Sequence, residues 1–232
     1  MTSSATHAQF GFLLDVDNTL LDNDALKAYL TRTLDETLGA GGAARFWALY
    51  EVVREERDVV DLPLTAERYA QTTATPEQTR EAVMAVYDGI PFASFLYPHT
   101  MDVLAHLNAL GVPSILSDGD GVFQKQKIER SGLSDAVGGR VLIYAHKEKH
   151  LDEVAAAYPV GHWVIVDDKS RILRDVKASW GKTVTTVHVL QGHYAQEEAE
   201  RAFHADITIA GIAELGQIDG DALLQAAGAL PV

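Results

Sequence analysis

The chain alternates between two hydrophobic patterns over most of its length. Short apolar runs bounded by polar turns are typical of buried strands, whereas apolar residues spaced three and four apart are typical of amphipathic helices. This alternation predicts an α/β fold, in which a parallel sheet carries helices on both faces. One of the expected helices covers residues 196–203, shortly before the final apolar run. The expected strands lie at residues 10–14, 112–116, 141–145, 162–166, 183–190 and 206–209.

Residues 22–90 interrupt the alternation, because they show helical periodicity and no strand pattern. Thr75 and Pro76 mark the start of the last helix in this segment, since a capping hydroxyl is followed by proline at the first helical position. Thr65 is expected to cap a shorter helix before it. The segment holds four helices, which is more than an ordinary connection between parallel strands contains. An inserted helical domain is therefore favoured over helices that merely pack on the sheet.

Composition narrows the class of protein. Of the 232 residues, 47% are hydrophobic and 22% are charged, which is typical of a soluble globular protein. No apolar run is long enough to span a bilayer and residues 1–7 lack a signal-peptide pattern, so we expect a cytoplasmic protein with no membrane partner. The absence of cysteine excludes disulfides and thiolate chemistry. A formal charge of −14 argues against a nucleic-acid partner, because phosphate contacts require clustered Lys and Arg.

The first apolar run ends in two carboxylates one residue apart, Asp15 and Asp17. In a parallel α/β sheet, the carboxyl end of a central strand opens into the crevice where ligands bind. Alternation along the strand sends the two side chains to the same side. Two acids held there are costly unless a cation or a proton separates their charges, so this strand end is a candidate site. In the alternative interpretation they are turn residues ahead of a helix that Asp22, Asn23 or Asp24 caps.

The string Asp15-Val16-Asp17-Asn18-Thr19-Leu20 resembles the first signature of the haloacid dehalogenase-like hydrolase superfamily, most of whose members are phosphatases. The resemblance implies a Rossmann-like core formed by residues 9–21 and 91–232. It also implies that residues 22–90 form an all-helical cap, which covers the site and selects the substrate. The family resemblance extends over nearly the whole chain, because three further motifs follow in the family's order.

The same resemblance assigns roles within the first signature. Asp15 would attack phosphorus, and Asp17 would act as general acid and base. Asn18 and Thr19 would shape the phosphate-binding turn, and Thr19 would orient a carboxylate by hydrogen bonding. Asn18 stands where the family often has glycine, but asparagine tolerates the left-handed backbone that such a turn adopts.

Two later strand ends resemble the second and third motifs of the family. In Ser117-Asp118-Gly119, the serine hydroxyl and nearby backbone N–H groups would hold the phosphoryl oxygens, and Gly119 would let the backbone approach closely. An ordinary turn is the alternative. Lys147 would stabilise the negative charge shared by the nucleophile and the phosphoryl group. Lys149 is a rival, because the proline that often follows the motif lysine is absent, and an exposed lysine at a helix start is the alternative for both.

Asp167 and Asp168 resemble the fourth motif, the acidic pair that holds magnesium. Mg²⁺ prefers oxygen ligands in near-octahedral geometry. Asp15, the main-chain carbonyl of Asp17, and Asp168 would supply the protein ligands, with Asp167 either a direct ligand or just outside the coordination sphere. Capping of the next helix is the alternative role for Asp168. The histidines are scattered without metal-ligand spacing, so a histidine metal site is not expected.

The four motifs together imply Mg²⁺-dependent hydrolysis of a small phosphorylated metabolite through an aspartyl-phosphate. A phosphomutase would retain the same motifs, and a regulatory module on this fold would accept phosphate without turnover. Carbon–halogen hydrolysis needs neither an acid at Asp17 nor a metal pair at Asp167 and Asp168, so dehalogenase activity is disfavoured. Lys125 and Lys127 are expected to be solvated helix positions. No pattern indicates which substrate is used or which oligomeric state is adopted.

Overall fold

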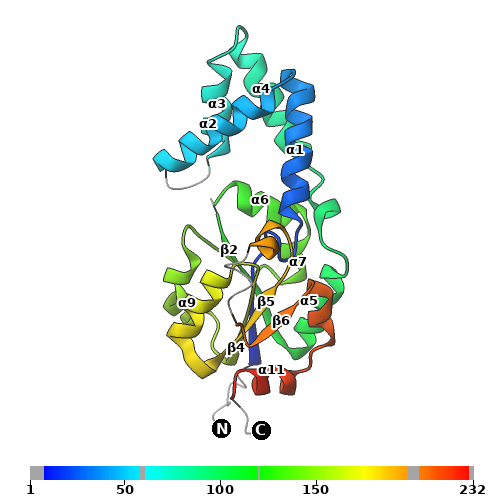
Figure 1. Ribbon diagram of the computed structural model, residues 1–232, viewed down its shortest axis with the longest axis vertical. Helices are drawn as coiled ribbons and strands as arrows, with labels where there is room; N and C mark the ends of the chain where they lie inside the picture. The colour runs from blue at the N-terminus through cyan, green and yellow to red at the C-terminus, as the bar shows by residue number, and fades with distance from the viewer. Residues whose placement is uncertain (1–7, 58–60, 120, 198–203, 230–232) are drawn as a thin grey trace, which may run out of the picture.

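The computed structural model describes residues 8–57, 61–119, 121–197 and 204–229. Within these residues one six-stranded sheet has the order β3-β2-β1-β4-β5-β6, and every neighbouring pair is parallel. The predicted strands are all present, which confirms the α/β fold class (Figure 1). The strands are β1 (Ala8–Leu14), β2 (Gly111–Asp118), β3 (Val141–Tyr144), β4 (Val160–Asp167), β5 (Val184–Val189) and β6 (Ile207–Ile209).

Both faces of the sheet are buried, because alternate residues of the central strands enter two different hydrophobic clusters. On β1, Leu13 points to one cluster, whereas Phe12 and Leu14 point to the other. Each of these side chains is fully buried, which contributes about 1.5–3 kcal/mol per residue. The Leu13 face is covered by α8 (Leu151–Ala157) and α9 (Ser170–Trp180). The Phe12 face is covered by α5 (Thr100–Leu110), α6 (Phe123–Arg130), α7 (Leu133–Ala136) and α11 (Gly220–Ala226).

Between β1 and β2 the chain forms a helical layer, α1–α4, which packs mainly on itself. Figure 1 shows this layer beyond the end of the sheet toward which the parallel strands run. Its apolar side chains join the hydrophobic cluster of the Phe12 face, so the layer and the sheet share a continuous core. The four helices are α1 (Asn23–Leu38), α2 (Gly42–Arg57), α3 (Leu62–Ala70) and α4 (Pro76–Asp88).

Helix starts within this layer follow local capping chemistry. Asp61 caps α3, because its carboxylate accepts a hydrogen bond of 2.9 Å from the backbone N–H of Leu64. The prediction that Thr65 caps this helix is therefore wrong: its hydroxyl lies one turn inside and donates to the Asp61 carbonyl. The predicted start of α4 is confirmed, with Pro76 as the first helical residue, although the Thr75 hydroxyl makes no capping hydrogen bond.

Short 3₁₀ turns connect several of the longer elements. None of the described helices combines the length and the apolar character needed to cross a membrane. The helix expected over 196–203 falls mainly outside the described residues, apart from the end of one such turn. The turns are η1 (Phe92–Phe95), η2 (Lys147–Lys149), η3 (Gly181–Thr183), η4 (His193–Gln196) and η5 (Ile212–Gln217).

Candidate active site

The carboxyl ends of three adjacent strands deliver polar side chains to one edge of the sheet. β1 lies between β2 and β4 and is parallel to both. Asp15 follows β1 directly, and its backbone N–H donates to the carbonyl of Val166 on β4 across 3.0 Å. Asp167 ends β4, and Ser117 lies near the end of β2. Strand pairing therefore brings together residues that are far apart in the sequence.

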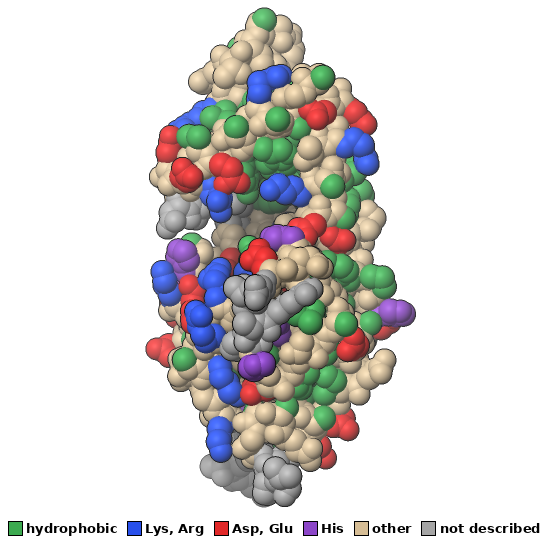
Figure 2. Space-filling view, in the orientation of Figure 1, with side chains coloured by type: hydrophobic (Ala, Val, Ile, Leu, Met, Phe, Trp, Pro, Cys, Tyr) green, Lys and Arg blue, Asp and Glu red, His purple; other side chains and the backbone are tan. Residues whose placement is uncertain are grey.

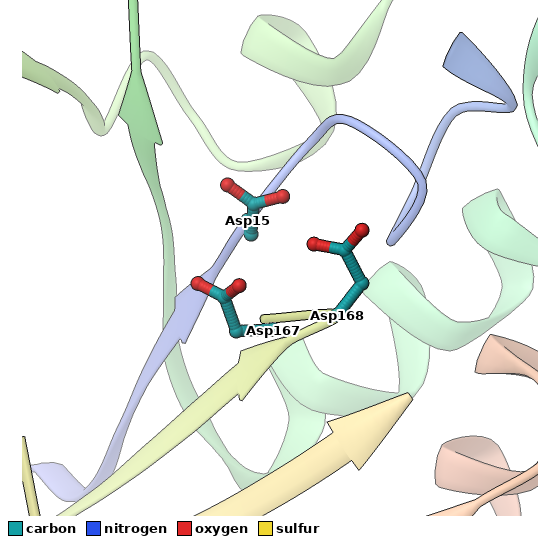
Figure 3. Close-up of side chains that lie close together, drawn as sticks. All are labelled: Asp15, Asp167 and Asp168. Carbon is teal, nitrogen blue, oxygen red and sulfur yellow. The ribbon is translucent and has the colours of Figure 1, made fainter. Parts of the chain in front are cut away.

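Asp15, Asp167 and Asp168 form a buried acidic cluster. Their solvent exposures are 3%, 0% and 1%, and one carboxylate oxygen of each lies within 4.8 Å of the others. Figure 3 shows the carboxylates of Asp15 and Asp168 on either side of a common space, with Asp167 completing the group. Among the described residues, Oδ2 of Asp15 and both carboxylate oxygens of Asp168 have no hydrogen-bond partner. Unpartnered buried carboxylate oxygens are costly, and they suit a cation that would coordinate them.

The electrostatics of this cluster favour a divalent cation. Burial, together with the neighbouring carboxylates of Asp15 and Asp167, raises the pKa of Asp168 to about 9. Burial likewise raises the pKa of Asp167, although Lys147 opposes this effect. A hard divalent cation would stabilise the ionised carboxylates that burial disfavours. The donor set is therefore compatible with Mg²⁺, and among the described residues the metal-compatible group contains no histidine.

Lys147 lies against the acidic cluster and is almost fully buried. Its Nζ forms an ion pair with Asp15 Oδ1, lies 2.7 Å from Asp167 Oδ2 and donates to the Leu116 carbonyl across 3.3 Å. Burial alone would lower the pKa of Lys147, but the nearby carboxylates outweigh it and raise the pKa above its usual value. Lys149, by contrast, is exposed. Of the two rival lysines, the structure thus brings Lys147 to Asp15.

The segment Ser117–Gly119 lies beside this cluster, and each of its residues has a distinct environment. The Ser117 hydroxyl is buried and accepts a hydrogen bond of 2.8 Å from Gln124 Nε2. Asp118 Oδ1 accepts a hydrogen bond of 2.9 Å from the backbone N–H of Lys147, so it anchors the turn that carries the lysine. Gly119 has φ 154°, a backbone conformation that side chains rarely adopt. Asp118 and Gly119 also line the cavity described below.

Asn18 and Thr19 are buried in the turn that follows Asp17. Asn18 has φ 60°, which confirms the expected left-handed backbone. Its side-chain oxygen accepts hydrogen bonds from the N–H groups of Asn23 and Asp24, at 3.1 and 3.3 Å, and so satisfies donors at the start of α1. The Thr19 hydroxyl has no hydrogen-bond partner in the described part of the chain, so the expected hydrogen bond from Thr19 to a carboxylate is not found there. A direct role of either residue toward phosphate stays a prediction.

Asp17 differs from the acidic cluster because its side chain remains 27% exposed and pairs with α6. Lys127 Nζ lies 2.6 Å from Asp17 Oδ1, and Lys127 itself is only 3% exposed. The prediction that Lys127 is a solvated position is therefore wrong, whereas Lys125 is exposed as predicted. The spacing of Gln124, Lys127 and Ile128 after the second motif was an available signal of an inward face. The Asp17 carboxylate is not part of the metal-compatible group, and ligation by its main-chain carbonyl stays a prediction.

A loop after β5 is fastened to the first motif, although no sequence motif marks it. Gln191 Nε2 donates to the carbonyl of Asn18 across 3.2 Å. The backbone N–H of His193 donates to Asp24 Oδ2 across 2.7 Å, and its ring Nδ1 lies 2.8 Å from Asp24 Oδ1. A side chain at Gly192 would meet Asn18, because an added Cβ would lie 2.4 Å from Asn18 Cγ. The close approach of this loop therefore requires glycine.

A cavity of about 350 Å³ lies between the helical layer and the sheet edge. Figure 2 shows the surface hollowed between the two parts, with hydrophobic side chains gathered on the helical side. The Tyr87 hydroxyl is buried without a hydrogen-bond partner among the described residues, and burial raises its pKa above the usual value. The helical side of the cavity carries aromatic residues together with Lys27, Glu51 and Arg54, and the opposite side carries charged residues. Its lining includes Trp47, Tyr50, Tyr87 and Phe123, together with Asp17, Asp118 and Lys127.

Comparisons with known proteins identify several similar structures. No family model and no curated protein matches the chain. A haloacid dehalogenase-like hydrolase from Burkholderia xenovorans LB400 is 44% identical with a TM-score of 0.82, and the match covers 94% of this chain and 99% of that one. The HAD-hydrolase YfnB from Bacillus subtilis, in a magnesium-bound structure, is 14% identical with a TM-score of 0.60, covering 90% and 97%. An L-2-haloacid dehalogenase from Xanthobacter autotrophicus is 16% identical with a TM-score of 0.55, covering 89% and 96%; these last two similarities concern the fold alone.

Proposed function

Because the chain belongs to the haloacid dehalogenase-like hydrolase family, we propose that it is a Mg²⁺-dependent hydrolase of small phosphate monoesters. The observation that carries the proposal is the buried acidic cluster of Asp15, Asp167 and Asp168. Its three carboxylates carry three negative charges when ionised, Lys147 offsets one of them, and a divalent cation matches the two that remain. Displacement of a halide needs no such cation, so this cluster supports phosphatase rather than dehalogenase chemistry.

Asp15 is the proposed nucleophile and Asp17 the proposed general acid and base. Asp15 attacks phosphorus while Asp17 gives a proton to the departing oxygen, so that the bond to the leaving group breaks as the aspartyl-phosphate forms. Asp17 then takes a proton from the water that attacks phosphorus, and Asp15 is released together with inorganic phosphate. Lys147 and Ser117 hold and neutralise the phosphoryl oxygens. The turns around them are formed by Asn18, Thr19, Asp118 and Gly119.

The proposed metal ligands are Asp15, Asp168 and the main-chain carbonyl of Asp17, with Asp167 beside them. The unpartnered oxygens of Asp15 and Asp168 support this assignment. When bound, Mg²⁺ supplies Lewis-acid stabilisation of negative charge on the phosphoryl oxygens. The protein's own role is to hold these carboxylates close together beside Lys147, whose positive charge offsets part of theirs.

Residues 22–90 are the proposed cap on a core of residues 9–21 and 91–232. The support is the cavity, whose walls come from α1, α2 and α4 on one side and from Asp17, Asp118 and Lys127 on the other. A volume of about 350 Å³ is at the small end of ligand pockets. The proposed partner is accordingly a small phosphorylated metabolite, with its phosphate at the sheet edge and its organic part against the aromatic wall.

The experiment that tests the function is phosphate release from a panel of phosphate monoesters, with Mg²⁺ and with a chelator. We expect sustained Mg²⁺-dependent release, and a fall of at least about 10⁴-fold in Asp15→Asn because the nucleophile is removed. The matched control is Asp175→Asn, which removes a solvent-exposed carboxylate on α9 and leaves turnover unchanged. Calorimetric titration with Mg²⁺ gives an independent readout, in which Asp168→Asn is expected to weaken binding.

Other products would contradict this assignment in recognisable ways. Chloride release from 2-chloro acids in place of phosphate release would establish a dehalogenase. Phosphate transfer to a second hydroxyl group of the substrate would establish a phosphomutase. One equivalent of aspartyl-phosphate without continuing release would indicate a regulatory module, and turnover that survives Asp15→Asn would remove the central residue of the proposal.

A further inference from the structure

One face of α6 meets the carboxylate of Asp17. Gln124 and Lys127 are three residues apart on this helix, which places their side chains on the same face. Lys127 Nζ lies 2.6 Å from Asp17 Oδ1, and Gln124 Nε2 donates to Asp17 Oδ2 across 3.4 Å. Each carboxylate oxygen of Asp17 is therefore contacted by a different side chain of the same helix.

The burial of Lys127 and Gln124 is costly unless their polar groups are paired. Both side chains are only 3% exposed. Lys127 Nζ also donates to Asn23 Oδ1 across 3.2 Å and lies 5.5 Å from the centre of the Phe123 ring. Gln124 Nε2 donates to the Ser117 hydroxyl across 2.8 Å. Through these contacts α6 links Asp17 to Ser117, the hydroxyl proposed to hold the phosphoryl group.

The opposite end of α6 is tied to the helical layer. The Arg130 guanidinium donates to the carbonyls of Asp88 and Ile90, across 2.7 and 2.9 Å, where α4 ends. Cations at a helix C-terminus satisfy carbonyl groups that lack partners within the helix. The helix that contacts Asp17 is therefore fixed at both ends, by Gln124 and Lys127 at the site and by Arg130 at α4.

Asp17 needs such support more than the other carboxylates of the site. Asp15, Asp167 and Asp168 are buried, whereas the Asp17 side chain is 27% exposed beyond the end of β1. A partly exposed carboxylate can rotate toward water, and proton transfer is efficient only when donor and acceptor are held in the correct geometry. The contacts from α6 restrict this rotation.

We propose that Gln124 and Lys127 are positioning residues, which hold Asp17 in the conformation from which it exchanges protons with the substrate and with water. The inference rests on the proposed phosphatase function. It extends that function to two residues outside the motif positions, and it assigns α6 the task of orienting the acid and base.

The experiment compares two substrates that differ in their need for a proton. An alkoxide leaving group must be protonated as the phosphorus–oxygen bond breaks, whereas nitrophenolate leaves without a proton. In Lys127→Met we expect kcat/KM to fall by about 10²-fold for an alkyl phosphate, the usual contribution of general acid catalysis. For p-nitrophenyl phosphate the fall should be less than about threefold, because that step does not use the acid.

The second chemical step provides a separate signature. Hydrolysis of the aspartyl-phosphate requires Asp17 as a base whichever leaving group has departed. Rapid mixing of Lys127→Met with p-nitrophenyl phosphate should therefore give a burst of nitrophenol close to one equivalent of enzyme, followed by slow turnover. A residue with only a structural role would not produce this burst.

Lys125→Met is the matched control, because Lys125 lies on the same helix with 63% of its side chain exposed. It should behave as wild type with both substrates. Thermal unfolding verifies that each variant is folded. Should Lys127→Met fail to fold, Lys127→Gln, which removes the charge but keeps a polar side chain, is expected to show the same dependence on the leaving group.

Three outcomes would overturn the inference. Equal losses of kcat/KM with the two substrates would mean that Lys127 supports the fold or the phosphate site. A rise in KM with unchanged kcat would mean that Lys127 binds substrate. Wild-type rates in Lys127→Met would exclude any role of Lys127 in positioning Asp17. In all three cases the Asp15-dependent turnover of wild type would preserve the proposed function, whereas a wild type without turnover would remove both proposals.

Discussion

The sheet edge and the helical layer lie on opposite sides of one cavity and differ in the kinds of residue that they carry. The sheet edge carries ionisable groups, including the acidic cluster and Lys147, and these are almost fully buried. The helical layer contributes aromatic side chains, for which Trp47 and Tyr87 are examples, together with charged ones such as Arg54. The ends of parallel strands hold charged groups at fixed positions, whereas helices pack apolar surface around whatever lies between them.

The two regions also differ in what they contribute to stability. Burial and the neighbouring carboxylates of Asp15 and Asp167 raise the pKa of Asp168 to about 9, so ionising the carboxylates of the sheet edge carries an energetic cost. Within the helical layer, Phe46 is fully buried in the hydrophobic cluster and stabilises the fold. Substitutions at the sheet edge should therefore affect the reaction most, and substitutions in the helical layer should affect mainly folding.

Among the substitutions that compare the two regions, Lys147→Met is expected to have the largest effect. Its removal leaves Asp15 and Asp167 without their cation, which should lower kcat by about 10²–10³-fold. Breaking a buried ion pair should also lower the free energy of unfolding by about 3–5 kcal/mol. Steady-state kinetics and urea unfolding measure the two effects. Lys149→Met, two residues further along and exposed, is the control; an equal loss there would contradict the assignment of Lys147.

A second substitution tests the contribution of the helical layer to folding stability. Phe46→Ala should lower the free energy of unfolding by about 3–5 kcal/mol, because its ring packs against Trp47, Tyr69 and Tyr87 and leaves a cavity when removed. Urea unfolding measures this loss. Val52→Ala, at a position on the same helix that is 46% exposed, should change stability by less than about 0.5 kcal/mol.

In the temperature range where Phe46→Ala remains folded, its kcat with p-nitrophenyl phosphate should stay within about threefold of wild type. A loss of kcat as large as that of Lys147→Met would show that the helical layer also orders the reacting groups. The proposal that catalysis depends on the sheet edge, whereas the helical layer affects mainly folding, would then be wrong.

The smallest effect concerns His162, near the start of β4 and so at the opposite end of the strand from the acidic cluster. Burial lowers the pKa of His162, and Lys177 lowers it further. The folded protein therefore holds this ring neutral, and its Nε2 lies 2.8 Å from the Thr185 hydroxyl. The Thr185 hydroxyl donates its single proton to the Leu223 carbonyl. It therefore acts as the acceptor toward His162, whose Nε2 donates the hydrogen bond between them.

The direction of the pH dependence follows from this lowered pKa. Above the unfolded pKa of about 6.5 the ring is neutral in both states, and no stability is lost. As the pH falls below that value, the unfolded chain binds a proton that the folded protein rejects, so stability decreases until the folded pKa is reached. His162→Gln should therefore make the decrease in stability between about pH 6.5 and pH 5.5 less steep.

Urea unfolding over this pH range provides the measurement for His162→Gln. His204→Gln, which changes an exposed histidine, is the control and should retain the wild-type acid sensitivity. If His162→Gln loses stability in acid as steeply as wild type, another group accounts for the pH dependence.

Several features of the fold and site follow from local sequence alone. Short apolar runs bounded by polar residues predict β1 and β4, and the polar residues directly after these runs predict Asp15, Asp167 and Asp168 as neighbours. These predictions succeed because parallel pairing aligns the carboxyl ends of adjacent strands. The start of α3 is mispredicted because Asp61 and Thr65 are both good capping residues, and the choice depends on where the helix begins.

The sequence by itself determined which chemical groups the site can contain, because strand periodicity and strand ends are properties of contiguous residues. Only the tertiary structure decided which lysines reach them. Lys147 and Asp15 are 132 positions apart, and Lys127 and Asp17 are 110 apart. A lysine on a helix is solvated unless another segment covers it, and that covering depends on packing between distant elements. The reacting carboxylates and the candidate Lys147 are thus evident in the sequence, whereas the choice of Lys147 over Lys149 and the approach of Lys127 to Asp17 are evident only in the folded chain.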